Sequence, residues 1–312
     1  MNHIILMRSS YSDFFTGSFV KLPEANSPIS IAAGSFWISS CIFRVLLAQA
    51  ITSTSSNTRV VVENSIFSGI SVSSCSGGAV YFVSASSEIV FNRVCGFNMN
   101  TASVSGAFAF ISTKSTGKCD FHESSFAFCA VSESANYGSL YLTNGQQDHS
   151  IINATNNNAN TRSFIFADYA VQGNVKYSCI IGCKSQFALC EHWNYCSGNY
   201  SYTNIINNTG SSLFYQDRSH STLRMYICVF IGNSDSLFQR AGGVMDVFDS
   251  YFDKTYISNG ASLYNTKSIS FTFTHKLFHT AECKGFSTQY FTEKIPKKLI
   301  SLLPVFYIQI VE

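Results

Sequence analysis

Charged side chains are scarce in this sequence. Asp, Glu, Lys and Arg make up 12% of the 312 residues, about half the share usual for soluble domains. The net charge is only +2, which gives no electrostatic basis for binding nucleic acid. Proline is also rare, with four in the chain, and no segment combines a sustained helical period with capping residues. These absences argue against nucleic-acid partners and against a helical fold.

A convincing targeting or membrane signal is also missing. The stretch FWISSCIFRVLLAQA (36–50) ends like a signal peptide, but it starts far from Met1 and Arg44 interrupts it. The apolar run LISLLPVFYIQIV (299–311) has thirteen residues and contains Pro304, whereas a membrane-spanning helix needs about twenty residues. We therefore expect no transmembrane helix.

What the chain does have is an internal repeat. With 46% apolar residues it can bury a large core without metals or disulfides. A triplet of a small or polar residue, a variable residue and a large apolar one recurs at steps of 24, 30, 29, 29, 26, 25, 24, 22 and 26 residues. Its ten copies begin at Cys41, Ser65, Cys95, Ser124, Asn153, Cys179, Asn204, Cys228, Ser250 and Lys276, and in the fifth copy Thr155 replaces the large apolar residue.

Two further apolar columns run in phase with this triplet, one of them beginning at copies such as Gly78-Ala-Val and Gly106-Ala-Phe. Each period therefore holds three short segments rich in Val, Ile, Phe and Tyr, separated by Gly, Asn and Ser. A leucine-rich repeat would need fixed leucines and a helical side, and a propeller blade needs about 40 residues. The sequence predicts an all-β, right-handed parallel β-helix of about ten coils with three strands each.

The repeat also predicts domain limits and a core. We expect the β-helix over 36–285, an N-terminal cap or partial first coil over 1–35, and a C-terminal tail or cap over 286–312. The third triplet position should form one buried ladder: Phe43, Phe67, Phe97, Phe126, Ile181, Ile206, Phe230, Phe252 and Phe278.

The segment CIIGCKSQFALCEHWNYC (179–196) resembles a zinc site, but the repeat gives another interpretation. Cys179 falls in the triplet column of Cys41 and Cys228, and in an extended strand Cys179 and Cys183 would lie about 13 Å apart. Zinc ligands must be much closer together, so we expect buried structural cysteines and no metal. A local disulfide between Cys190 and Cys196 remains an alternative, and the count of eleven cysteines is odd.

Two other patterns carry chemical hypotheses. His275-x3-His279 with Glu282 and Cys283 resembles a metal-binding string, but it flanks a predicted strand, so we expect no metal there either. Asn153, Asn199 and Asn207 stand in Asn-x-Ser/Thr sequons, which predicts glycosylation and an extracellular or cell-surface location.

Two short motifs resemble a known family. Gly77-Gly-Ala-Val80 and Phe230-Ile-Gly-Asn233 look like the GGA[IVL] and FxxN motifs of polymorphic outer-membrane-protein repeats, which also occur in surface proteins of parasitic protists. The periodicity that carries the resemblance covers roughly residues 36–285. The resemblance implies a right-handed parallel β-helix with a non-enzymatic role in adhesion or display, together with a membrane anchor or translocation domain.

The competing function is a polysaccharide lyase or glycoside hydrolase, since such enzymes also use the β-helix. Their chemistry needs convergent carboxylates and bases. The repeat frame brings together only pairs, Asp120 with His149 and Arg224 with Asp246, and we expect each pair to be in contact. An enzyme is therefore the less favoured hypothesis.

The favoured hypothesis is a cofactor-free scaffold for adhesion. Its long faces carry Ser, Thr, Asn and Tyr, which suit hydrogen bonding to glycans or to host and cell-surface proteins, with rings available to stack on sugars.

Overall fold

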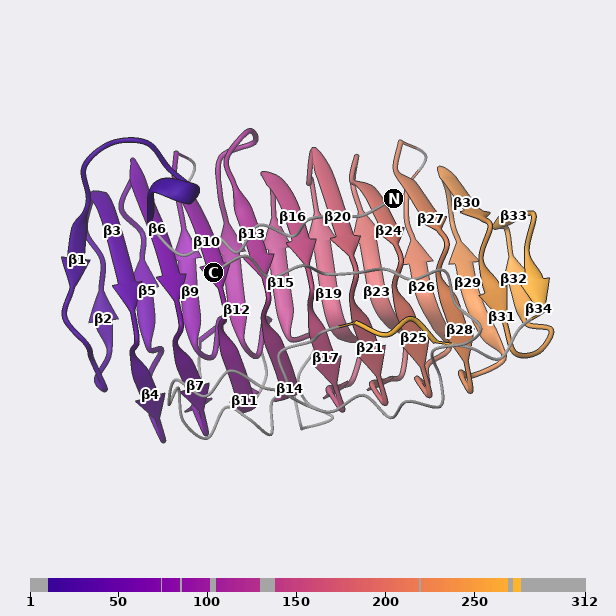
Figure 1. The fold of residues 1–312 in the computed structure, drawn as a ribbon, viewed down its shortest axis with the longest axis horizontal. Coiled ribbons are helices and arrows are strands. Elements are labelled where there is room, and N and C mark those ends of the chain that lie inside the picture. Colours follow the sequence, from indigo (N-terminus) through magenta and orange to yellow (C-terminus); the bar gives the residue numbers. More distant parts are fainter. Residues whose placement is uncertain are drawn as a thin grey trace.

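The computed structural model describes residues 11–73, 75–84, 86–101, 105–129, 138–218, 220–268 and 272–275. These residues form a parallel β-solenoid, as the sequence predicts, in which successive coils stack along one axis (Figure 1). The helical content in this part of the chain is one 3-10 turn, η1 (Tyr11–Asp13). The repeat was expected to give about ten coils. The three long sheets contain 10 or 11 strands each, and the solenoid makes about eight turns.

Three sheets run the length of the solenoid. Sheet A consists of β1 (Val20–Leu22), β3 (Gly34–Ser39), β6 (Thr58–Glu63), β10 (Glu88–Asn92), β13 (Cys119–His122), β16 (Gln146–Ser150), β20 (Gln172–Lys176), β24 (Ser197–Ser201), β27 (Thr222–Tyr226), β30 (Val244–Phe248) and β33 (Ser262–Tyr264). Sheet B consists of β2 (Ile29–Ser30), β5 (Ile51–Ser53), β9 (Val80–Val83), β12 (Ala109–Ser112), β15 (Leu140–Thr143), β19 (Arg162–Asp168), β23 (Ala188–Trp193), β26 (Ser212–Gln216), β29 (Ser236–Arg240) and β32 (Ile257–Asn259).

Sheet C consists of β4 (Ile42–Arg44), β7 (Ile66–Ser68), β11 (Cys95–Thr101), β14 (Ser125–Cys129), β17 (Asn153–Thr155), β21 (Cys179–Ile181), β25 (Asn204–Ile206), β28 (Val229–Ile231), β31 (Tyr251–Phe252) and β34 (Lys267–Ser268). The short strand β8 (Ser71–Val72) pairs with the end of β11, and β18 (Asn158–Ala159) pairs with β22 (Lys184–Ser185). In each coil the chain passes from sheet A to sheet C, then to sheet B, and back to sheet A.

The corner between sheets A and C sets which side chains enter the core. One residue there has a positive φ in successive coils, as at Ser40 (60°), Glu123 (45°) and Asp249 (49°). The residue three positions later always points inward. This rule gives the core column of sheet C: Phe43, Phe67, Gly96, Phe126, Ala154, Ile180, Ile205, Phe230 and Phe252.

The predicted ladder is wrong at three positions. Phe97 is 40% exposed, and Ile181 and Ile206 are half-buried on the outer face. Their triplets begin two residues after the corner rather than one, so the second residue of each triplet points inward. Phe278 lies outside the described residues.

Gly96 interrupts the ring column for a steric reason. Phe108 reaches the same space from the corner before sheet B, and its ring lies 5.4 Å from that of Phe67 and 4.7 Å from that of Phe126. A Cβ on Gly96 would come within 2.7 Å of the Phe108 ring. A bulky residue in that coil therefore has to point outward, which places Phe97 on the surface.

The corner between sheets C and B explains the FxxN motif. Phe230 points inward, Gly232 turns the chain with φ of 63°, and the buried Asn233 faces the preceding coil. Its Oδ1 accepts a hydrogen bond from the Asn208 backbone (2.9 Å), and its Nδ2 donates to the Ile205 carbonyl (2.7 Å). Asn157 and Asn208 make the same contacts in earlier coils.

The N-terminal residues lie against a side of the solenoid. Tyr11, Phe14 and Phe15 bury a small cluster with Val61 and Val90 on the outer face of sheet A. Strand β1 already pairs with β3, and β2 with β5, so residues 20–30 form part of the stack. The tail expected over 286–312 lies outside the described residues.

Candidate functional site

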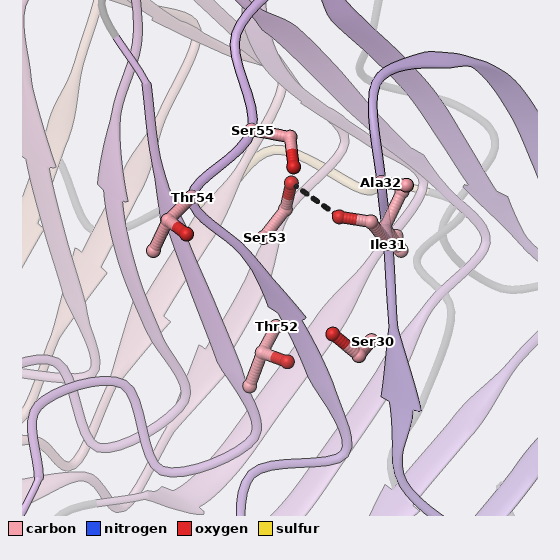
Figure 2. Close-up of a pocket in the computed structure, with 7 residues that line it drawn as sticks. All are labelled: Ser30, Ile31, Ala32, Thr52, Ser53, Thr54 and Ser55. Atoms are coloured by element: carbon pink, nitrogen blue, oxygen red, sulfur yellow. Dashed lines mark hydrogen bonds between the residues drawn. The ribbon is translucent and has the colours of Figure 1, made fainter.

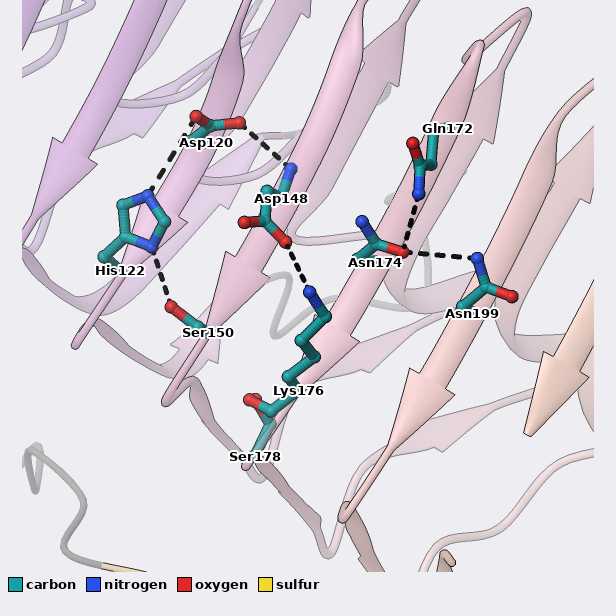
Figure 3. A network of polar contacts seen from close by, with 9 residues as sticks. All are labelled: Asp120, His122, Asp148, Ser150, Gln172, Asn174, Lys176, Ser178 and Asn199. Carbon is teal, nitrogen blue, oxygen red and sulfur yellow. Dashed lines mark hydrogen bonds and ion pairs between the residues drawn. The ribbon is translucent and has the colours of Figure 1, made fainter. Parts of the chain in front are cut away.

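The outer face of sheet A is polar over strands β13, β16, β20 and β24 (Figure 3). In its middle, Asp120 Oδ1 accepts a hydrogen bond from the Asp148 backbone (3.0 Å), and His122 Nδ1 lies 2.7 Å from Ser150 Oγ. Lys176 Nζ is 3.6 Å from Asp148 Oδ1. The charged groups of this region are therefore engaged with neighbours one coil away.

An uncharged row follows on the next strands. Asn199 Nδ2 donates to Asn174 Oδ1 (3.2 Å), and Gln172 Nε2 lies 3.4 Å from the same oxygen (Figure 3). We call Gln172, Asn174 and Asn199 the amide row. An amide group offers both donors and acceptors, and this row is half-buried to exposed.

The two predicted ion pairs have different outcomes. Arg224 and Asp246 are register partners on β27 and β30, with Nε 4.0 Å from Oδ2. The expected contact of Asp120 with His149 is wrong, because His149 pairs with Phe121 and points into the core while Asp120 faces outward. Burial lowers the pKa of His149 to about 3.

Exposed rings mark the corner where sheet B returns to sheet A. Tyr169 is 50% exposed and Tyr195 is 61% exposed, and His220 is also exposed. The Tyr195 ring lies 6.3 Å from that of Tyr169 and 4.9 Å from that of His220, each at 25°. We call these three residues the aromatic corner. It leads directly into the strands of the amide row, since Gln172 and Asn199 follow Tyr169 and Tyr195 within four residues.

Acidic groups lie beside this corner on sheet B. Trp193 stands opposite Asp168, donates through Nε1 to Asp217 and lies 5.7 Å from the guanidinium of Arg218. Asn194 Nδ2 donates to Asp168 Oδ1 (2.9 Å). Burial raises the pKa of the Asp168 carboxyl above its ordinary value.

A second carboxyl in this region is paired. Glu191 is buried on β23 and bonds Arg162, whose guanidinium also lies 5.3 Å from the Phe166 ring. Burial raises the pKa of Glu191, and the hydrogen bond from Arg162 opposes this shift.

A pocket of about 260 Å³ lies near the N-terminal end of sheet B (Figure 2). Ser53 Oγ donates to the Ile31 carbonyl across it (3.0 Å). Its lining is small and uncharged and offers no acid or base: Ser30, Ile31, Ala32, Thr52, Ser53, Thr54 and Ser55.

The cysteines of 179–196 do not converge. Cys179 lies on the outer face of sheet C, in register with Asn153 and Asn204 and therefore one position after the column of Cys41 and Cys228, which corrects its expected place. Cys183 and Cys190 are buried in the core. In the part of the chain that the structure describes, no group of three or more His, Cys, Asp or Glu could hold a metal ion.

Cys190 and Cys196 are free buried thiols, so the alternative of a disulfide between them is wrong. Cys196 Sγ instead lies 3.3 Å from His192 Nδ1, and the Tyr200 hydroxyl lies 3.1 Å from His192 Nε2. Burial raises the pKa of Cys196 to about 12 and lowers that of His192 to about 4. Both groups are therefore neutral near pH 7, which leaves no reactive thiolate here.

The three sequons differ in accessibility. Asn207 is exposed and Asn199 is half-buried. Asn153 is buried in β17, and the Thr155 hydroxyl donates to its Oδ1 (2.9 Å). A glycan on Asn153 would not fit this fold, so glycosylation stays a prediction for Asn207 and Asn199.

The remaining sequence patterns are only partly covered. His275 is described and makes contacts treated below, whereas His279, Glu282 and Cys283 lie outside the described residues. The residues that the structure describes contain no helix with the length and apolarity to cross a membrane. Comparison with known proteins gives no matching family model, no matching curated protein and no matching solved structure.

Proposed function

We propose that this protein is a non-enzymatic scaffold that binds neutral glycans through the aromatic corner and the amide row. The observation that carries the proposal is the position of two protruding tyrosines, Tyr169 and Tyr195, at the entry to the strands that bear Gln172, Asn174 and Asn199.

Sugars need two kinds of contact. Their C–H faces pack against aromatic rings, and their hydroxyls both donate and accept hydrogen bonds. The aromatic corner supplies the rings, and the amide row supplies paired donors and acceptors on a rigid sheet. Because the coils are about 4.8 Å apart, the same groups recur along the axis, which suits an extended glycan.

A protein of this kind fits the cell surface or the extracellular space, where we propose that it acts in adhesion. The GGAV and FIGN motifs support this placement through their resemblance to polymorphic outer-membrane-protein repeats. The two exposed or half-exposed sequons are consistent with secretion.

A second candidate is a glycoside hydrolase, favoured by one arrangement on sheet B. Asp168 ends β19 and Asp217 directly follows β26, one coil on either side of Trp193, so their Cα atoms lie about 10 Å apart at the usual strand spacing. Inverting glycosidases separate two carboxyls by about 6.5–9.5 Å, with one of them protonated. The raised pKa of Asp168 gives it the character of the acid.

A glycan array with the purified chain tests both candidates. We expect binding without product release, and a loss of tenfold or more in affinity for Tyr195→Ala and for Asn199→Ala. Tyr264→Ala is the matched control, because Tyr264 is an exposed tyrosine on sheet A far from the corner, and it should leave binding unchanged.

Other results would decide against the proposal. Release of shortened glycans that stops in Asp168→Asn would establish the hydrolase. Failure to bind any glycan, or binding that Tyr264→Ala weakens as much as Tyr195→Ala, would overturn the glycan-binding surface.

A further inference from the structure

On the outer face of sheet C, one row of side chains is buried although it points away from the core. This row lies near the start of the strands, one residue before the core column. Polar members of the row include Ser125, Asn153 and Asn204, none of them more than 4% exposed. Residues 272–275 lie on this row, three coils back from the last strand, and cross β21 and β25 (Figure 1).

Asn204 holds this segment by its backbone. Asn204 Nδ2 donates to the Phe273 carbonyl (2.8 Å), and the Phe273 amide donates to Asn204 Oδ1 (2.9 Å). A side-chain amide that satisfies both backbone groups of one residue imitates the pairing of a neighbouring strand. Asn204 Nδ2 also lies 3.2 Å from Cys179 Sγ, so this thiol sits beneath the contact.

Rings complete the attachment. Tyr177 and Tyr202 stack at 5.2 Å. The Phe273 ring lies 6.1 Å from that of Tyr202, and the His275 ring lies 6.4 Å from that of Tyr177. These neighbours leave His275 half-buried, and its ring makes a hydrogen bond with the Tyr202 backbone.

We propose that residues 272–275 form an acid-released strap, which Asn204 fastens to the outer face of sheet C and which protonation of His275 detaches. The titratable groups on the elements packed against the strap are Tyr177, Tyr202 and Cys179. Burial raises the pKa of Tyr177, and it raises the pKa of Cys179 to about 11. No carboxylate among the described residues makes a contact with His275 that would stabilise an imidazolium.

The direction of the pH dependence of docking follows from this environment. Burial lowers the pKa of His275 to about 4, below its value of 6.5 in a detached strap. Docking is therefore fully favoured above pH 6.5 and weakens as pH falls toward 4. Between pH 7 and pH 5 the equilibrium constant for opening rises about twentyfold.

Hydrogen exchange of the full chain tests this directly. Exchange at the Phe273 amide, divided by its intrinsic rate at each pH, should rise about twentyfold from pH 7 to pH 5. His275→Phe keeps a ring but cannot be protonated, and it should remove the pH dependence. Asn204→Ala should speed exchange at both pH values.

Two cysteines separate strap release from unfolding. Cys179 lies under the strap, whereas Cys190 lies in the core. Labelling with 4,4′-dithiodipyridine is measured as a rate relative to that of glutathione at the same pH. This relative rate should be higher at pH 5 than at pH 7 for Cys179, while Cys190 stays protected. Equal acceleration at Cys190, or an acid response that persists in His275→Phe, would overturn the proposal.

Discussion

Two rows of aromatic residues on this solenoid behave differently. On the outer face of sheet B, Tyr81, Phe110, Tyr141 and Phe166 form a ring ladder with centroid distances of 5.6, 4.7 and 4.7 Å. Its first three rings are half-buried and Phe166 is buried. The rings of the aromatic corner instead protrude, and Tyr195 is more exposed than Tyr169.

The difference comes from the backbone. Ladder rings stand on paired strands, so each ring covers the faces of its neighbours and presents only edges. Tyr169 and Tyr195 have φ of 51° and 48°, which turns their side chains out of the sheet. One ring per coil therefore stabilises the stack when it lies on a strand, and is exposed to solvent when it lies at the corner.

Truncating one ring of each row gives the largest contrast. Phe166→Ala should lower the free energy of unfolding by about 3–5 kcal/mol, because a fully buried ring leaves a cavity. Tyr169→Ala, three residues later, should change it by less than about 0.5 kcal/mol. Urea unfolding of both variants measures this, and similar losses would mean that the corner rings also hold the fold.

A second pair of substitutions compares two neighbouring asparagines at one corner. Asn208 points into the core at the corner between sheets C and B, where its Oδ1 accepts from the Cys183 amide (2.9 Å) and its Nδ2 donates to the Ile180 carbonyl (2.9 Å). Asn208→Ala strands both backbone groups, at a cost of about 2–3 kcal/mol. Asn207→Ala, at the exposed neighbour with φ of 53°, is the control and should cost less than about 1 kcal/mol in the same urea assay.

The sequence shows the repeat but not every register. The 24–30-residue period and the motifs with glycine and asparagine identify the solenoid, because each coil needs the same corners. Cys179-Ile-Ile181 was placed in the wrong register, because Ile180 and Ile181 are equally apolar and the corner residue Tyr177 has no distinctive signature. Phe97 was misplaced because Phe108, from another column, fills its expected space.

The candidate surface was missed for a related reason. Tyr169, Tyr195 and His220 recur at intervals of 26 and 25 residues, which matches the local period and could have indicated a row. Nothing in residue type separates these tyrosines from those of the ring ladder. Arg224 and Asp246 were placed correctly because their coil contains no register slip.

Histidines extend the comparison to pH. His149 and His192 are buried with pKa lowered to about 3 and about 4, whereas His220 is exposed. Because each folded-state pKa lies below the unfolded value of 6.5, stability is complete above pH 6.5 and falls as the pH drops.

At pH 5 each buried histidine should cost about 2 kcal/mol of unfolding free energy relative to pH 7.5. His149→Leu should remove its share of this loss, while His220→Gln should leave the pH profile unchanged. Urea midpoints at pH 7.5 and pH 5 provide the measurement. A profile that responds to His220→Gln instead would place the sensitive histidine outside the core.

The smallest expected effect gives the sharpest distinction between the rows. Tyr195 has φ of 48°, a conformation that glycine adopts freely and that costs other residues about 1 kcal/mol. Tyr195→Gly should therefore be about 1 kcal/mol more stable than Tyr195→Ala, and both variants should lose glycan binding to the same extent. Thermal unfolding and the glycan array are read on the same samples. If the glycine variant gains stability while binding is lost, the tyrosine at this corner serves recognition and not folding, whereas retained binding would remove Tyr195 from the proposed surface.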